Sequence, residues 1–292
     1  MKKYIFSFLA LTGLFTASCS NDEIKIETEE YVANHVVTFD VATDFMYEEL
    51  GVKSGMKNQI LSDDKSHIGI FTYIYDDKGD IVDSLFSQTK TFAQISQQVT
   101  LKEGKYTVVS VETVVNKNYD YVPDRWRLIN TNKLSDCEIH SIGDHSWFEA
   151  VGVASTTITV VKDETYKLSP VAYGSIIDID YYNFDKSNYE AIRLYTRNQA
   201  AGIKLNPELS GDSRFTWDIY TEEHYWYSRG GTARKSQLDA KGSFTPYIME
   251  TGRIECGLAA LTFDEDGHTN NFAIYPSSNF YLTLEKGKFY YG

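Results

Sequence analysis

Apolar and polar residues alternate along much of the chain with the period of two that is typical of β-strands. Between His67 and Tyr75, isoleucine and threonine occupy one face and phenylalanine and tyrosine the other. A strand that is apolar on both faces is expected inside a sandwich of two sheets. The acidic segment 76–80 predicts a turn around Gly79, and the apolar run 81–86 completes a β-hairpin.

Further strands are predicted in the first half at 97–101, 106–111, 157–161 and 165–168. We expect the first two to extend the hairpin into an antiparallel meander. We expect the last two to pair with each other across a turn at 162–164. Two stretches, 45–61 and 189–198, do not follow the strand pattern, and each is expected to form a short helix or an irregular loop.

The strand pattern begins again after Pro170. Ile177 and Ile179 alternate with aspartates, which predicts a strand with one face in a core and one in water. Later strands are predicted at 215–220, 253–263, 271–275 and 280–284, with an acidic hairpin turn at 264–267. Residues 282–290 also repeat the pattern of residues 99–107, in which an apolar strand, a charged pair, Gly-Lys and an aromatic strand follow one another. This repetition predicts the duplication of a domain type.

The N-terminal 18 residues have the composition of a secretory signal peptide. Two lysines precede an apolar run over residues 4–15, which is too short to span a membrane, and small residues at 16–18 lead to Cys19. This arrangement is similar to a bacterial lipobox, in which the cysteine is acylated and becomes the first residue, although Thr16 replaces the usual leucine. Plain secretion is the alternative.

The chain is acidic, and the excess of negative charge begins directly after the signal peptide. The sequence contains 28 Lys and Arg against 41 Asp and Glu, a net charge of −13, and cleavage before Cys19 removes two lysines, giving 26 − 41 = −15. Such a charge excludes nucleic acid as an expected partner. Residues 19–31 are too polar to fold and are expected to form a tether. Their composition is similar to the acidic export signals of outer-membrane lipoproteins in Bacteroidota, and a plain solvated linker is the alternative.

Cysteine and histidine positions predict neither a disulfide framework nor a metal site. With Cys19 acylated, we expect Cys137 and Cys256 to be free and buried thiols. His140 and His145 have an unspecific spacing, and the acidic turns do not match a calcium loop. The sequence contains no nucleophile elbow, zinc motif or phosphate-binding loop. We therefore expect a non-enzymatic protein without catalytic residues, metal or cofactor.

Aromatic residues make up 14 % of the chain and form one candidate binding segment. Tyr225, Trp226 and Tyr227 are consecutive and precede Arg229, and because successive strand side chains point to opposite faces, at least one ring is expected to be exposed. Exposed Trp, Tyr and Arg are frequent in binding hot spots, so a glycan or a protein is the expected ligand. Trp126, between two arginines, is a weaker candidate of the same kind. Core packing is the alternative for both.

Together these features resemble the fimbrillin superfamily of Bacteroidales, and within it the minor, anchor-type fimbrial lipoproteins. The resemblance rests on the lipobox, the acidic tether, the hairpin at 68–82, the strand pair at 99–111 and the segment 173–179. It implies an all-β fold of two tandem transthyretin-like antiparallel β-sandwich domains, residues 32–170 and 171–292. These motifs are short and concern the fold, and a fold alone does not imply a function.

The function that this resemblance implies is that of a surface-exposed lipoprotein of the outer membrane. Such a protein acts in cell adhesion or in fimbrial anchoring and assembly, with other fimbrial or surface subunits as partners. Sheet edges are the expected contact surface, because fimbrillins add strands to open edges. The end of the chain at Gly292, directly after a strand-like segment, favours an anchor or accessory subunit over a shaft subunit. A glycan-binding lipoprotein of a polysaccharide-uptake system is the alternative.

Overall fold

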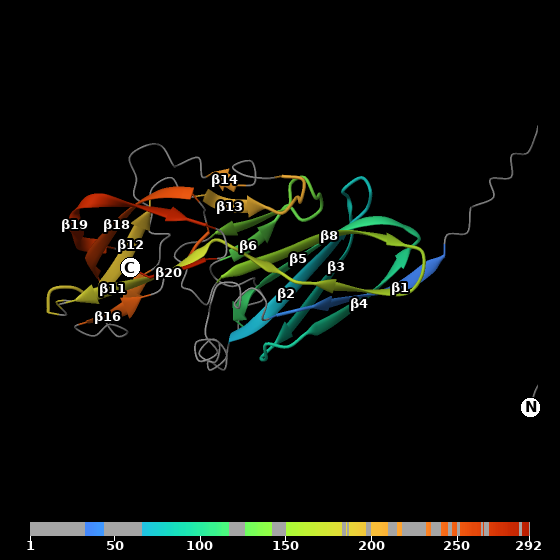
Figure 1. Cartoon of the computed structure of the whole chain (residues 1–292), viewed down its shortest axis with the longest axis horizontal. Coiled ribbons are helices and arrows are strands. Elements are labelled where there is room, and N and C mark those ends of the chain that lie inside the picture. Colours follow the sequence, from blue (N-terminus) through green and yellow to red (C-terminus); the bar gives the residue numbers. More distant parts are fainter. Residues whose placement is uncertain are drawn as a thin grey trace, which may run out of the picture. The chain divides into compact units, whose positions relative to one another are not determined.

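The computed structural model has an all-β fold, which confirms the predicted fold class (Figure 1). It describes residues 33–43, 66–116, 126–141, 150–182, 185, 187–196, 200–209, 215–217, 232–234, 241–244, 247–249, 252–263, 265, 269–285 and 288–291. Residues 33–292 form one compact unit. None of the described residues belongs to a helix that would be long and apolar enough to cross a membrane.

Two sheets form a first sandwich. The three-stranded sheet has the order β4-β1-β9, with β4 at Ile95–Lys102, β1 at Asn34–Val41 and β9 at Glu164–Leu168. The five-stranded sheet has the order β10-β8-β5-β2-β3, with β10 at Val171–Tyr173, β8 at Val151–Val160, β5 at Gly104–Asn116, β2 at Ser66–Tyr75 and β3 at Ile81–Thr89. Buried side chains from both sheets, among them Phe39 of β1 and Ile70 of β2, form one core cluster.

The predicted hairpin between β2 and β3 is confirmed. The two strands are antiparallel, and Gly79 in the turn has a φ of 74°, a conformation that glycine adopts without steric cost. The Asp76 carboxylate accepts hydrogen bonds from the backbone N–H groups of Lys78 and Asp80, each at 2.9 Å. Asp76 therefore serves the turn, as aspartate does in many tight turns.

The predicted meander is wrong, because β4 leaves the hairpin and pairs with β1 in the other sheet, while β5 takes the place beside β2. The predicted pairing of the segments at 157–161 and 165–168 is also wrong, since β9 pairs in parallel with β1. Only one face of β4 is buried, at Gln97, Val99 and Leu101, which is expected of a strand in a sheet that covers another. Burial of a face does not identify the neighbouring strand, and the order of strands along the chain misplaced β4.

A second pair of sheets is built from the rest of the chain. In one sheet β11 (Ser175–Tyr182) pairs antiparallel with β16 (Lys241–Phe244) and β17 (Tyr247–Ile248) and parallel with β20 (Lys288–Tyr291). The other has the order β15-β12-β18-β19, with β15 at Thr232–Arg234, β12 at Ala191–Thr196, β18 at Gly252–Phe263 and β19 at Thr269–Leu284. Strand β12 therefore replaces the helix or loop expected at 189–198, while the stretch 45–61 lies outside the described residues.

The two sandwiches have the same strand order. In each, the first strand is central. It has an antiparallel neighbour on one side and a parallel neighbour from late in the same half of the chain on the other, as in β4-β1-β9 and β16/β17-β11-β20, and β10 is an additional strand of the first sandwich. The facing sheets correspond as β3-β2-β5-β8 and β15-β12-β18-β19. By this correspondence β4 and β5 match β16/β17 and β18. The repeat of 99–107 at 282–290, which spans β19 and β20, therefore does not join equivalent strands. The division into domains at residue 170 stays a prediction.

A further sheet draws strands from both sides of that predicted boundary. Its order is β14-β13-β7-β6, with β14 at Phe215–Trp217, β13 at Ala200–Lys204, β7 at Glu138–Ser141 and β6 at Trp126–Ile129. Strands β6 and β7 lie in sequence between β5 and β8, and strands β13 and β14 lie between β12 and β15. Segments inserted into the two sandwiches thus form one sheet together.

Candidate interaction surface

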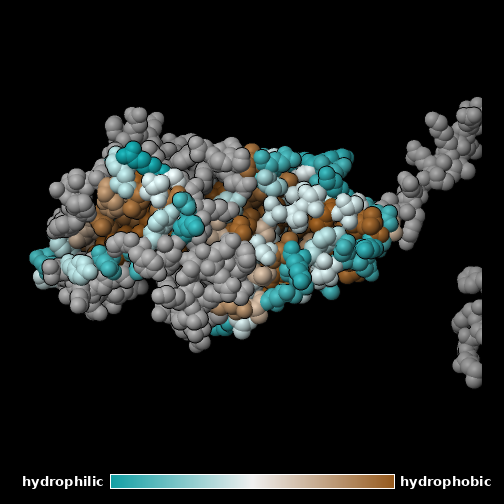
Figure 2. Space-filling view, in the orientation of Figure 1, coloured by the Kyte–Doolittle hydropathy of each residue, from teal (hydrophilic) through white to brown (hydrophobic). Residues whose placement is uncertain are grey.

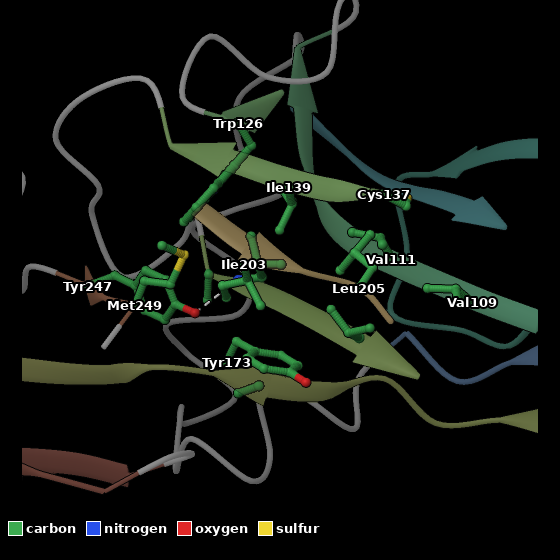
Figure 3. Packing of buried hydrophobic residues seen from close by; sticks show 14 of the residues in the cluster. Val109, Val111, Trp126, Cys137, Ile139, Tyr173, Ile203, Leu205, Tyr247 and Met249 are labelled. Carbon is green, nitrogen blue, oxygen red and sulfur yellow. Dashed lines mark hydrogen bonds between the residues drawn. The ribbon is translucent and has the colours of Figure 1, made fainter. Parts of the chain in front are cut away.

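The structure places Trp126 in the core and not on the surface. Its side chain is fully buried, and its ring meets the ring of Tyr247 edge to face, with centroids 6.2 Å apart and an interplanar angle of 76° (Figure 3). This is core packing, the alternative weighed for Trp126, and the ring presents no exposed face to a ligand. The other candidates, Tyr225–Tyr227, Arg229 and the lipidation site Cys19, lie outside the described residues.

The β14-β13-β7-β6 sheet brings the backbone of Trp126 and that of Trp217 to one end of the sheet. In the pairing of neighbouring strands, Trp126 lies opposite Ser141 and Ala200 lies opposite Trp217. The first residues of β6 and β13 and the last residues of β7 and β14 therefore lie at one end of the sheet. Of the four tryptophans of the chain, residue 126 begins β6 and residue 217 ends β14, while residues 147 and 226 follow β7 and β14 in sequence and lie outside the described residues. This arrangement depends on the pairing of strands, which a single sequence does not reveal.

Strand β3 is the second candidate surface, because it forms an edge of the five-stranded sheet. Among the described strands it pairs only with β2. Its side chains include two large exposed hydrophobic groups, Val82 at 46 % and Phe86 at 53 % of their full exposure. The Phe86 ring packs on that of Phe71 from β2, with centroids 4.7 Å apart. Figure 2 shows that hydrophobic residues reach the surface between hydrophilic ones.

The segment between β6 and β7 braces the hairpin that carries this edge. The backbone N–H of Ile81 donates to the carbonyl of Asn132 at 3.1 Å, and that of Leu134 donates to Gly79 at 2.9 Å. The ammonium group of Lys133 lies 2.5 Å from the Asp80 carboxylate, and this hydrogen bond raises the pKa of Lys133. Two backbone hydrogen bonds and an ion pair therefore hold the start of β3 in place. The side of β3 that faces away from β2 has no partner strand among the described residues and can pair with another chain.

Burial keeps two titratable side chains near this brace, those of Tyr73 and Cys137, in their neutral forms. Burial, and next the nearby Cys137, raises the pKa of Tyr73 to about 12, and burial likewise raises the pKa of the Cys137 thiol. A buried thiol with a raised pKa is a poor nucleophile, so the cysteine is structural. Cys137 and Cys256 are both free and buried, as predicted. No group of three or more potential metal ligands occurs among the described residues.

His140, one of the two histidines singled out in the sequence, is paired with a carboxylate. Its Nδ1 lies 3.1 Å from Oε1 of Glu138 on the same strand, and its backbone is opposite Gly202 of β13. His145 lies outside the described residues. The arrangement at His140 is a partly buried pair of side chains on β7.

The sequence matches no family model and no curated protein. Among solved structures, the chain is similar to a candidate polysaccharide-binding protein of Bacteroides thetaiotaomicron, with 8 % identity, 86 % of this chain and 98 % of that chain covered and a TM-score of 0.47. It is also similar to a candidate adhesin of the same species, with 10 % identity, coverages of 84 % and 81 % and a TM-score of 0.48.

A third similar structure is the fimbrial anchor protein Mfa2 of Porphyromonas gingivalis, with 10 % identity, coverages of 83 % and 82 % and a TM-score of 0.41. All three TM-scores lie below 0.5. The described residues define an all-β protein in which β3 forms an edge of the five-stranded sheet.

Proposed function

We propose that this protein is a non-enzymatic surface lipoprotein that acts in cell adhesion or in the anchoring and assembly of fimbriae. Cys19 carries the lipid that attaches it to the outer membrane, and residues 19–31 form the tether. Two tandem domains, 32–170 and 171–292, project from the cell and contact other fimbrial or surface subunits. The observation that carries the proposal is the edge of β3, with Val82 and Phe86 exposed beside it.

An edge strand with exposed hydrophobic side chains is suited to bind an extended segment of another protein. The backbone of the edge supplies hydrogen bonds, and alternate side chains supply contacts for specificity. Natural proteins usually protect edge strands by charge, proline or short length. Strand β3 runs from Ile81 to Thr89, contains no proline, and has only one charged residue, Asp83. The brace at Lys133 and Asp80 fixes the edge before a partner arrives, which lowers the entropy lost on binding.

The test replaces the exposed hydrophobic groups of β3 by lysine. In Val82→Lys, Phe86→Lys and the double variant, we expect the yield of cross-linked complexes with other surface proteins on intact cells to fall about tenfold or more. Val36→Lys is the matched control, because Val36 is exposed to 44 % but lies on β1, which has a strand on both sides. Equal yields for the wild type, the control and the double variant would contradict the proposal.

Glycan binding is the second candidate function, and the gathering of strand ends in the β14-β13-β7-β6 sheet favours it. Neighbouring strands are about 4.8 Å apart, so the four strand ends span about 14 Å, and the segments that hold Trp147 and Trp226 continue from two of them. Planar aromatic rings pack against the apolar faces of sugars. We assign Tyr225, Trp226, Tyr227 and Arg229 to this function, while the buried Trp126 supports the sheet.

A glycan array with the purified mature protein tests this second candidate. If the protein binds a glycan, Trp226→Ala is expected to reduce the signal about tenfold, since a stacked aromatic side chain is a typical hot spot. Tyr281→Ala is the matched control, because this ring is 54 % exposed on β19, a strand of a different sheet. The absence of binding to every glycan, or equal loss in both variants, would remove this function from consideration.

A further inference from the structure

We infer that the β14-β13-β7-β6 sheet and the buried cluster on its inner face form a rigid joint between the two sandwiches. Because of this joint, residues 33–292 unfold cooperatively as one unit. The inference goes beyond the proposed function, because it concerns how the two sandwiches are coupled and holds whichever ligand the protein binds. Two sandwiches with separate cores are usually expected to behave as independent domains. Three features of the structure oppose that expectation here.

The first feature is the sheet itself, which neither sandwich can complete alone. The central contact is the antiparallel pair of β7 and β13, with Glu138, Ile139 and His140 opposite Lys204, Ile203 and Gly202. Strands β6 and β7 come from the first half of the chain, and β13 and β14 come from the second. A two-stranded hairpin is marginally stable in water by itself, so each pair depends on the other for its stability.

The second feature is the buried cluster on the inner face of this sheet (Figure 3). It contains 17 buried residues, against 13 in the core of the first sandwich and 8 in the main core of the second, counted over the described residues. Trp126 and Ile139 enter it from the first half, and Ile203 and Tyr247 enter it from the second. Separating the halves would expose apolar side chains of this cluster to water, and such exposure is the main cost of unfolding.

The third feature is the close approach of the chain at the crossing from one half to the other. Gly174, between β10 and β11, has a φ of 98°. A Cβ atom added there would lie 2.3 Å from the carbonyl oxygen of Ile248 and 2.7 Å from Cα of Met249. The backbone of Ile248 and Met249, in the second half, therefore lies directly against Gly174. The crossing from one half to the other is therefore closely packed and has no room for a side chain at residue 174.

The two buried cysteines provide a probe in each half. Cys137 belongs to the shared cluster, and Cys256 belongs to the core of the second sandwich. The full mature protein is equilibrated in urea and pulsed with N-ethylmaleimide, and mass spectrometry then gives the labelled fraction at each cysteine. A coupled protein is expected to give the same urea midpoint at both sites.

Two matched variants test the coupling directly. Ile70→Ala removes a fully buried side chain from the first sandwich alone, and Ile177→Ala removes a buried side chain, 3 % exposed, from the second alone. In a coupled protein each variant lowers the midpoint at both cysteines by the same amount, about 1 M urea. If the alanine variants do not fold, the valine variants give the same comparison with a smaller shift.

Independent halves would give a different result. Ile177→Ala would then lower the midpoint at Cys256 and leave that at Cys137 unchanged, and two wild-type midpoints would differ. Either observation overturns the inference. Ile203→Asp, which places a charge between β13 and the shared cluster, is expected to separate the two midpoints in an otherwise coupled protein. These outcomes concern unfolding alone, so they are independent of whether β3 binds a partner.

Discussion

At the scale of single residues, the first sandwich contains a small polar network inside an apolar core. The hydroxyl of Thr72 donates to Oε1 of Gln97 at 2.7 Å and lies 3.0 Å from Oγ of Ser110. The Gln97 amide nitrogen donates to the hydroxyl of Ser87 at 3.2 Å. Gln97 belongs to β4 and its partners to the facing sheet, so the network fixes the register of one sheet against the other. Buried polar groups of this kind are stabilising only when their partners are present.

Gln97→Leu is expected to lower the free energy of unfolding by about 1–3 kcal/mol, because Thr72 loses its buried acceptor and Ser87 loses a donor. The measurement is equilibrium unfolding in urea. Gln98→Leu is the matched control, since Gln98 is exposed on the same strand and is expected to change stability by less than about 0.5 kcal/mol. Equal stability of the two variants would show that the network contributes nothing.

At the scale of elements, hydrophobic alternation and turn chemistry predicted most strands but not their neighbours. The hairpin of β2 and β3 was predictable, because Asp76 and Gly79 are typical turn residues between two apolar runs. The pairing of β4 with β1 was not, since alternation tells which face of a strand is buried and not which strand lies beside it. The exposure of Phe86 was missed for the same reason. Of the candidate residues only Trp126 is described, and a run of aromatic residues does not distinguish a core from a surface.

The face of β2 that packs against the shared cluster makes the stability of the protein sensitive to alkaline pH. The pKa of Tyr73 is raised to about 12, chiefly by burial, whereas tyrosine in an unfolded chain has a pKa of about 10. The folded protein therefore favours the neutral phenol. The stabilisation is fully present below pH of about 10 and is lost as the pH rises toward about 12, which amounts to about 2–3 kcal/mol.

Tyr73→Phe is expected to flatten this alkaline loss of stability, measured as the urea midpoint at pH 9 and at pH 11. Tyr182→Phe is the matched control, because the Tyr182 side chain is 71 % exposed. If Tyr73→Phe and the wild type lose stability in parallel over this range, the phenol of Tyr73 does not contribute to the pH dependence.

At the scale of the whole molecule, the proposal places the lipid at one end of the chain and the binding surfaces in the folded part. Cys19→Ala is expected to abolish the incorporation of labelled palmitate and to release the protein from the membrane fraction into the medium or the periplasm. Cys137→Ala is a control that removes a buried thiol and leaves Cys19 in place. Palmitate labelling of Cys19→Ala at the wild-type level would refute lipidation at this residue.

The parallel pairing of β1 with β9 also has a consequence for the order of events during biogenesis. Val37 lies opposite Glu164, 127 positions later in the chain, and β11 has the same relation to β20 at the end of the second half. Contacts between such distant segments form slowly, because a long loop must close first. Neither covering sheet can close until the last strand of its half has emerged. For the surface lipoprotein proposed above, we therefore expect the chain to stay unfolded during export and able to pass through the secretion machinery.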